Sequence, residues 1–100
     1  MTDTLTPEKL AQTLHLPGPP AQLPPLVEAL WWDAKGSWTR AHEIAQQIHT
    51  RDAAWVHAYL HRCEGDLQNA GHWYRNAGRP VSTLPLDEEW REIASALLTS

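Results

Sequence analysis

Apolar residues recur every three or four positions in four successive stretches of the chain, which is the spacing of helices with one apolar face. These stretches cover residues 25–35, 38–48, 53–64 and 67–77. Only a few residues separate each stretch from the next, and short connections of this kind join antiparallel neighbours. The pattern predicts an all-α fold with two antiparallel helical hairpins, at 23–49 and 50–78.

The two expected hairpins share a short motif with a period of 29 residues. The first copy reads Lys35-Gly36-Ser37-Trp38-x-x-Ala41, and the second reads Glu64-Gly65-Asp66-Leu67-x-x-Ala70. In each copy a Gly ends one helix and a Ser or Asp caps the next. Ala41 and Ala70 are expected where the two helices of each hairpin cross closely. A repeat of this length indicates one supersecondary unit used twice.

The two ends of the chain add one helix each to the prediction, within a single domain of residues 1–100. Residues 1–20 are expected to form a short helix, capped by Thr6 before Pro7, and then a Pro-rich connector that makes this helix an appendage. Residues 86–98 are expected to form a C-terminal capping helix. Asp87 would be its N-cap, and its apolar face comprises Trp90, Ile93, Ala94 and Leu97.

Composition narrows the classes of partner and compartment. The formal net charge is −4 with only 8 Lys and Arg, so the basic surface expected of a nucleic-acid-binding protein is missing. Neither a secretory signal nor a stretch of membrane-spanning length is present, and Cys63 has no second cysteine to pair with. We therefore expect a cytoplasmic protein. With 6 Trp and no Phe, tryptophan must supply most of the aromatic packing.

The second hairpin resembles a known repeat family. The motif Gly65-Asp66-Leu67-x-x-Ala70-x-x-x-Tyr74-x-x-Ala77 is similar to the second half of a tetratricopeptide repeat, and Trp73-Tyr74-x-x-Ala77 is similar to the end of Sel-like repeats. The period of 29 is shorter than the 34 of tetratricopeptide repeats. The whole chain also resembles small uncharacterised bacterial proteins rich in Trp and His motifs, which implies no particular activity. The repeat resemblance implies an all-helical fold with a binding surface on the first helix of each hairpin.

That resemblance places four residues of the second hairpin on the concave side: Asp52, Trp55, Tyr59 and Arg62. Two aromatic rings beside a guanidinium group suit an extended segment that ends in a carboxylate. The alternative is that Trp55 and Tyr59 are core residues, that Arg62 has an internal acidic partner, and that the last helix fills the groove. The leading hypothesis is a non-enzymatic module that binds a protein or peptide and needs no cofactor.

A different function is suggested by His57 and His61, which are four residues apart and so project from one side of a helix, with Glu64 beside them. Imidazoles at this spacing bind Zn²⁺ or Ni²⁺ if the facing helix supplies a third ligand, such as His72. The alternative is that the pair makes hydrogen bonds between helices, and this structural role is the one we expect. Cys63 is expected to be an inert buried thiol, so no catalytic residue is predicted. A third hypothesis is a structural subunit that forms homo-oligomers.

Overall fold

The computed structural model describes residues 5–99, and within this range the chain is all-helical with no strand. The elements in order are α1 (Pro7–Ala11), α2 (Pro25–Ala34), α3 (Trp38–Gln46), α4 (Arg51–Cys63), α5 (Leu67–Ala77) and α6 (Leu86–Thr99). The first four residues of the segment predicted at 1–20 lie outside the described range. None of the described helices is both long enough and apolar enough to cross a membrane.

Three of the predicted helix starts are confirmed by their capping hydrogen bonds. The side chains of Thr6, Thr50 and Asp66 each accept a hydrogen bond from a backbone N–H three residues later, at 3.0–3.2 Å. Ser37 lies at the N-cap of α3, but its side chain makes no capping bond. Asp87 is not the N-cap of the last helix, because α6 already begins at Leu86. Instead, the carbonyl of Pro85 accepts hydrogen bonds from the backbone N–H groups of Glu88 and Glu89.

The connections after α2 and α4 have the same geometry. Gly36 and Gly65 take φ angles of +95° and +84°, which side chains with a Cβ rarely adopt. In both turns the residue after the glycine donates its N–H to a carbonyl five residues back, from Ser37 to Trp32 at 2.8 Å and from Asp66 to His61 at 2.9 Å. These bonds close the ends of α2 and α4 in the same way. The equivalence spans the same 29 residues as the sequence motif.

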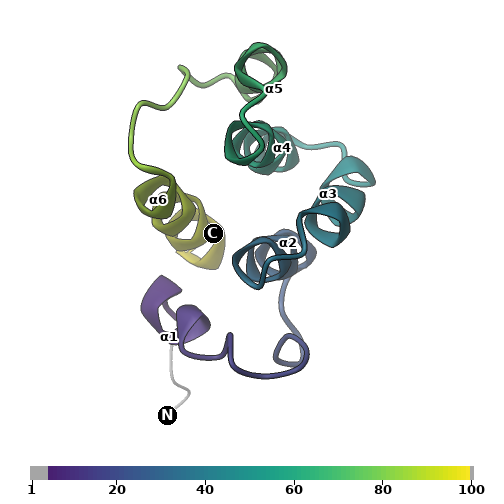
Figure 1. Ribbon diagram of the computed structural model, residues 1–100, viewed down its shortest axis with the longest axis vertical. Helices are drawn as coiled ribbons and strands as arrows, with labels where there is room; N and C mark the ends of the chain where they lie inside the picture. The colour runs from purple at the N-terminus through teal and green to yellow at the C-terminus, as the bar shows by residue number, and fades with distance from the viewer. Residues whose placement is uncertain (1–4, 100) are drawn as a thin grey trace.

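Figure 1 shows α2 and α4 between α3 on one side and α6 on the other. Helix α4 packs against α5, α3, α6 and α2, so it is the central element of the fold. Nine successive residues of α4, from Ala53 to His61, are buried. The chain returns from α5 through residues 78–85 to place α6 against α4 and α2.

Several burial predictions hold and three fail. Ala41 and Ala70 are fully buried, as expected for close helix crossings, and Trp90, Ile93 and Ala94 face the core. Leu67 is 67% exposed although the repeat placed it on the inward face. Ala34, which falls on the apolar spacing of the stretch 25–35, is also exposed. The first helix is not an appendage, because Leu10 is completely buried and α1 packs against α6 and α2. The indole N–H of Trp31 also bonds to the hydroxyl of Thr13, at 3.0 Å.

Candidate metal-binding site

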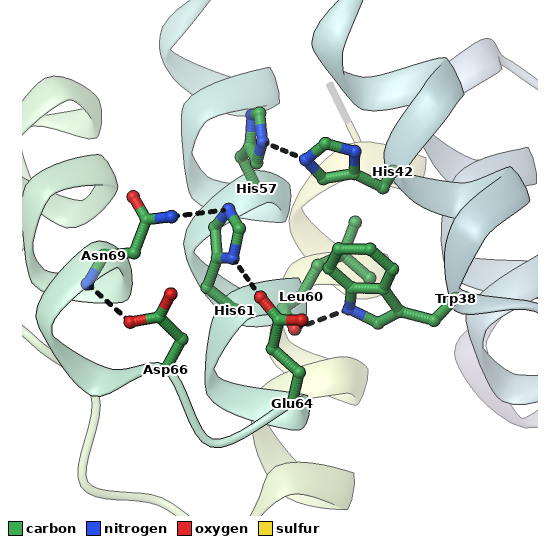
Figure 2. Close-up of polar contacts among 8 residues, drawn as sticks. All are labelled: Trp38, His42, His57, Leu60, His61, Glu64, Asp66 and Asn69. Carbon is green, nitrogen blue, oxygen red and sulfur yellow. Dashed lines mark hydrogen bonds and ion pairs between the residues drawn. The ribbon is translucent and has the colours of Figure 1, made fainter.

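Helix α4 carries two different polar groups on opposite sides. Its one side faces α6 and α2 and carries Trp55, Tyr59 and Arg62. Its other side faces α3 and α5 and carries His57 and His61, which are one turn apart (Figure 2). Both imidazoles are buried, with exposed fractions of 5% and 6%. Polar rings in such a position need partners, because burying an unpaired polar group is costly.

A third imidazole comes from α3. His42 follows the buried Ala41 on α3, which packs against both α2 and α4, and its ring lies beside the histidines of α4. The Nε2 atoms of His42 and His57 lie 2.8 Å apart, a hydrogen bond in which one ring donates and the other accepts. The ring centroid of His42 is 4.5 Å from that of His57 and 5.5 Å from that of His61. Two helices thus bring three imidazoles together.

Two tryptophans hold these rings in place. Trp38 stacks on His42 with centroids 4.7 Å apart, and Trp73 of α5 stacks on His57 at 3.9 Å. The indole N–H of Trp38 donates to the carbonyl of Leu60, at 2.7 Å, which fixes the tryptophan to α4 (Figure 2). The flat indole faces stacked on both imidazoles limit their rotation.

The orientation of His61 is set by two hydrogen bonds. Its Nδ1 lies 2.6 Å from Oε1 of Glu64, and its Nε2 lies 3.4 Å from the side-chain nitrogen of Asn69 (Figure 2). The carboxylate of Glu64 accepts a hydrogen bond from Nδ1–H, and the amide N–H of Asn69 donates towards Nε2. Both contacts favour the tautomer of His61 that has its lone pair on Nε2. A carboxylate behind the imidazole is also the usual outer partner of histidines that bind metals.

The cluster favours uncharged imidazoles. Burial first, and the neighbouring rings of His42 and His61 next, lower the pKa of His57 to about 4. The pKa of His42 is also lowered, first by burial and then by His61. Neutral imidazole is the form that binds a metal ion, so protons compete weakly for these two rings near neutral pH.

The spacing of the three nitrogens fits one transition-metal ion. Zn²⁺ binds imidazole nitrogen at about 2.0–2.1 Å in tetrahedral geometry, so three such nitrogens lie within about 4 Å of one another. One nitrogen from each of His42, His57 and His61 lies within 4.8 Å of the other two. To hold one ion, the rings would have to turn until the three nitrogens face one point. Three neutral ligands leave the ion with its full charge and one position for a further ligand.

The sequence identified part of this cluster. It placed His57, His61 and Glu64 side by side, and the structure brings them together. It suggested His72 as the third ligand, but that ring lies exposed on α5 beside Asn76 and the edge of Trp73. The third imidazole, His42, was missed. The sequence offered one indication of it, because His42 directly follows Ala41, the alanine predicted at a helix crossing.

The residues predicted to line a concave groove lie elsewhere. Trp55 and Tyr59 are 2% and 4% exposed beneath α6 and α2, and Asp52 lies exposed near the start of α4. Arg62 pairs with Glu89 of α6, its Nη1 being 2.5 Å from Oε1, and its Nη2 donates to the carbonyl of Leu84 at 2.6 Å. These contacts leave no open groove at this place, because α6 occupies the space where an extended segment would lie.

Glu89, which the sequence did not single out, supplies the carboxylate expected of a ligand. Its side chain is completely buried. Its Oε2 accepts hydrogen bonds from the hydroxyl of Tyr74 at 2.5 Å and from the indole N–H of Trp55 at 3.2 Å. The carboxylate therefore joins α6 to α4 and α5. Of the predicted set, Trp55 and Arg62 hold a carboxylate, but it belongs to the same chain, and the second ring on it is Tyr74 and not Tyr59.

The only cysteine lies away from the histidine cluster, in contact with Tyr59. Burial first, and the nearby carboxylate of Asp33 next, raise the pKa of the half-buried Cys63 thiol to about 11. A thiol in this state carries little thiolate at neutral pH and is a poor nucleophile. This agrees with the prediction that Cys63 is inert.

In comparisons with known proteins, no family model, curated protein or solved structure matches the chain. The site is therefore interpreted from its own geometry.

Proposed function

We propose that this protein binds a divalent transition-metal ion, with Zn²⁺ the best fit, through His42, His57 and His61. The observation that carries the proposal is the convergence of three imidazole nitrogens from two helices within 4.8 Å, with two of the rings buried and that of His42 half-buried. The sequence alone favoured a structural role for His57 and His61, because two histidines on one helix are a poor metal site. A third imidazole from α3 completes the number of protein ligands that open zinc sites commonly have.

The surroundings of the cluster support this proposal over a simple hydrogen-bonded network. Glu64 accepts a hydrogen bond from Nδ1 of His61, which keeps the lone pair on Nε2, and an ion would replace the long contact of 3.4 Å that Nε2 makes with Asn69. Stacking on Trp38 and Trp73 pre-orients the other two rings, which reduces the entropy lost on binding. An ion held between α3 and α4 would also stabilise the packing of these two helices.

Metal analysis of protein purified without an affinity tag tests the proposal. We expect one Zn²⁺ per chain after dialysis against trace zinc. At a free concentration 100 times the Kd, zinc would stabilise the fold by about 2.7 kcal/mol, which corresponds to a rise in Tm of about 10–20 °C for a domain of this size.

Three variants separate the site from adventitious binding. His42→Ala should abolish stoichiometric zinc binding. The control His72→Ala removes an exposed imidazole next to Trp73 and should leave zinc binding intact. Glu64→Gln, at an exposed position, should keep the fold and weaken zinc binding about 10- to 100-fold. Protein that stays metal-free and whose Tm ignores Zn²⁺ would contradict the proposal. Zinc binding that survives His42→Ala would do the same.

We also infer that α2–α3 and α4–α5 are two antiparallel copies of one unit of the tetratricopeptide or Sel-like kind. The matching φ angles of Gly36 and Gly65, the matching turn hydrogen bonds and the buried Ala41 and Ala70 support this relationship. All these pairs are separated by the same 29 residues.

A protein-binding function is the second proposal, and it requires a surface other than the filled groove. The segment between α5 and α6 offers one, because Val81, Leu84 and Leu86 are 39–55% exposed within six residues. A second copy of the chain is the simplest partner for this apolar segment. Sedimentation over a range of concentrations should then show dimers that Val81→Ser weakens. A monomer at all concentrations would contradict self-association.

A further inference from the structure

An open cavity of about 580 Å³ adjoins the histidine cluster, and His57 forms part of its wall. The cavity lies between the end of α3, the start of α4 and α5. Its apolar lining includes Ala45, Ile48, Ala53, Ala54 and Trp73. Trp73 is the ring that stacks on His57, so the cavity and the proposed metal site share two side chains. The volume is within the range of cavities that bind small molecules.

The polar groups around this cavity select for negative charge. Arg51 lies at its rim, and among the described residues no Asp or Glu lines it, although the chain as a whole is acidic. The amino end of α4 also points here, and its backbone dipole adds partial positive charge. Arg51 and His57 are six residues apart on this helix, which separates their Cα atoms by about 9 Å along the axis. The cavity therefore has a cationic group at one end and the proposed ion at the other.

We propose that the cavity binds a short dicarboxylate. This inference rests on the proposed metal function. One carboxylate takes the position on the ion that the three imidazoles leave open. The apolar stem lies against Trp73 and the alanines of α3 and α4, and the second carboxylate pairs with the guanidinium of Arg51. A five-carbon chain holds its two carboxyl carbons about 5 Å apart, and the long side chain of Arg51 makes up the rest of the ~9 Å between the two helix positions.

The test uses the full-length protein loaded with Co²⁺, whose visible absorption bands report changes in its ligands. Glutarate is the probe, and butyrate, which has one carboxylate on a similar stem, is its matched control. We expect glutarate to shift the bands and to bind about tenfold more tightly than butyrate, because a charged hydrogen-bonded pair at Arg51 adds to the affinity. Arg51→Gln should reduce glutarate binding to that of butyrate. Arg75→Gln, at an exposed arginine of α5 outside the cavity, should change neither.

The outcomes separate the two proposals. If Co²⁺ binds but its spectrum ignores glutarate, the cavity is not a dicarboxylate site and the metal function stands. If wild type binds glutarate no more tightly than butyrate, or if Arg51→Gln keeps the preference for glutarate, the pairing with Arg51 is wrong and the inference falls. If no Co²⁺ binds, both proposals fail together.

Discussion

At the scale of single residues, His57 is a group whose charge state affects folding. His57 is buried against the rings of His42 and His61, and His61 in turn bonds to the carboxylate of Glu64. Its pKa is lowered to about 4 by burial first and by the two neighbouring imidazoles next. In the unfolded chain the same ring has an ordinary pKa of about 6.5. Between these values the unfolded state binds the additional proton.

This difference predicts a loss of stability in acid. The contribution of His57 is fully present above about pH 6.5, and it is lost as the pH falls towards 4, because protonation then favours the unfolded state. At pH 4.5 the loss is about 2 kcal/mol in metal-free protein. Urea melts at pH 7.5 and 4.5 measure it. His57→Phe should reduce the difference between the two pH values, and His72→Ala, at an exposed ring, should not. An equal pH dependence in wild type and His57→Phe would show that another group is responsible.

At the scale of elements, local signals predicted most of the fold. The positions of five helices follow from apolar spacing together with Gly36, Gly65, Thr50 and Asp66, all of which act within one turn of the chain. What failed depends on contacts across the chain. Leu67 belongs to the apolar stripe of α5 by its spacing, but no helix covers that end of the stripe, so it remains exposed. The spacing of apolar residues identifies the apolar face of a helix, but it does not show how much of that face a neighbouring helix covers.

Ala70 and Leu67 test this distinction within one helix. Ala70 is 1% exposed where α5 crosses α4, and a leucine there would overpack the crossing and lower the free energy of unfolding by about 1–3 kcal/mol. Leu67→Ala, three residues earlier, removes an exposed side chain and should change it by less than about 0.5 kcal/mol. Urea denaturation of both variants measures the difference. A neutral Ala70→Leu would mean that the two helices do not approach closely at this position.

The candidate site divides in the same way. The i, i+4 pair His57 and His61 was predictable, because both lie on one helix. His42 could be added only by knowing how α3 crosses α4. Glu89 was not predictable either, because its sequence neighbours Asp87 and Glu88 are exposed and its partners are on other helices. A charged residue in an acidic, amphipathic stretch is normally solvated. Its burial depends on the path of residues 78–85, which local signals do not determine.

At the scale of the whole molecule, tryptophan side chains connect the helices into a closed arrangement. The indole N–H of Trp38 binds α4, that of Trp55 binds Glu89 of α6, and that of Trp90 binds the carbonyl of Leu30 in α2, at 2.9 Å. The bonded residues are 22, 34 and 60 positions apart in the sequence, respectively. The prediction that tryptophan carries the aromatic packing is confirmed in these contacts. Glu89 is the member of this arrangement that carries a charge.

Glu89 should therefore be the most costly carboxylate to remove from the fold. In Glu89→Ala the guanidinium of Arg62, whose side chain is 14% exposed, loses its ion-pair partner, and Tyr74 and Trp55 lose their acceptor. Removing one partner of a buried ion pair costs about 3–5 kcal/mol, a large share of the stability of a domain of this size. Glu88→Ala, one residue earlier and exposed, should change stability by less than about 0.5 kcal/mol. Urea melts of both variants measure the effect, and a double-mutant cycle with Arg62→Gln gives the share due to the pair. If Glu89→Ala and Glu88→Ala unfold at the same urea concentration, α6 is held by its apolar face alone.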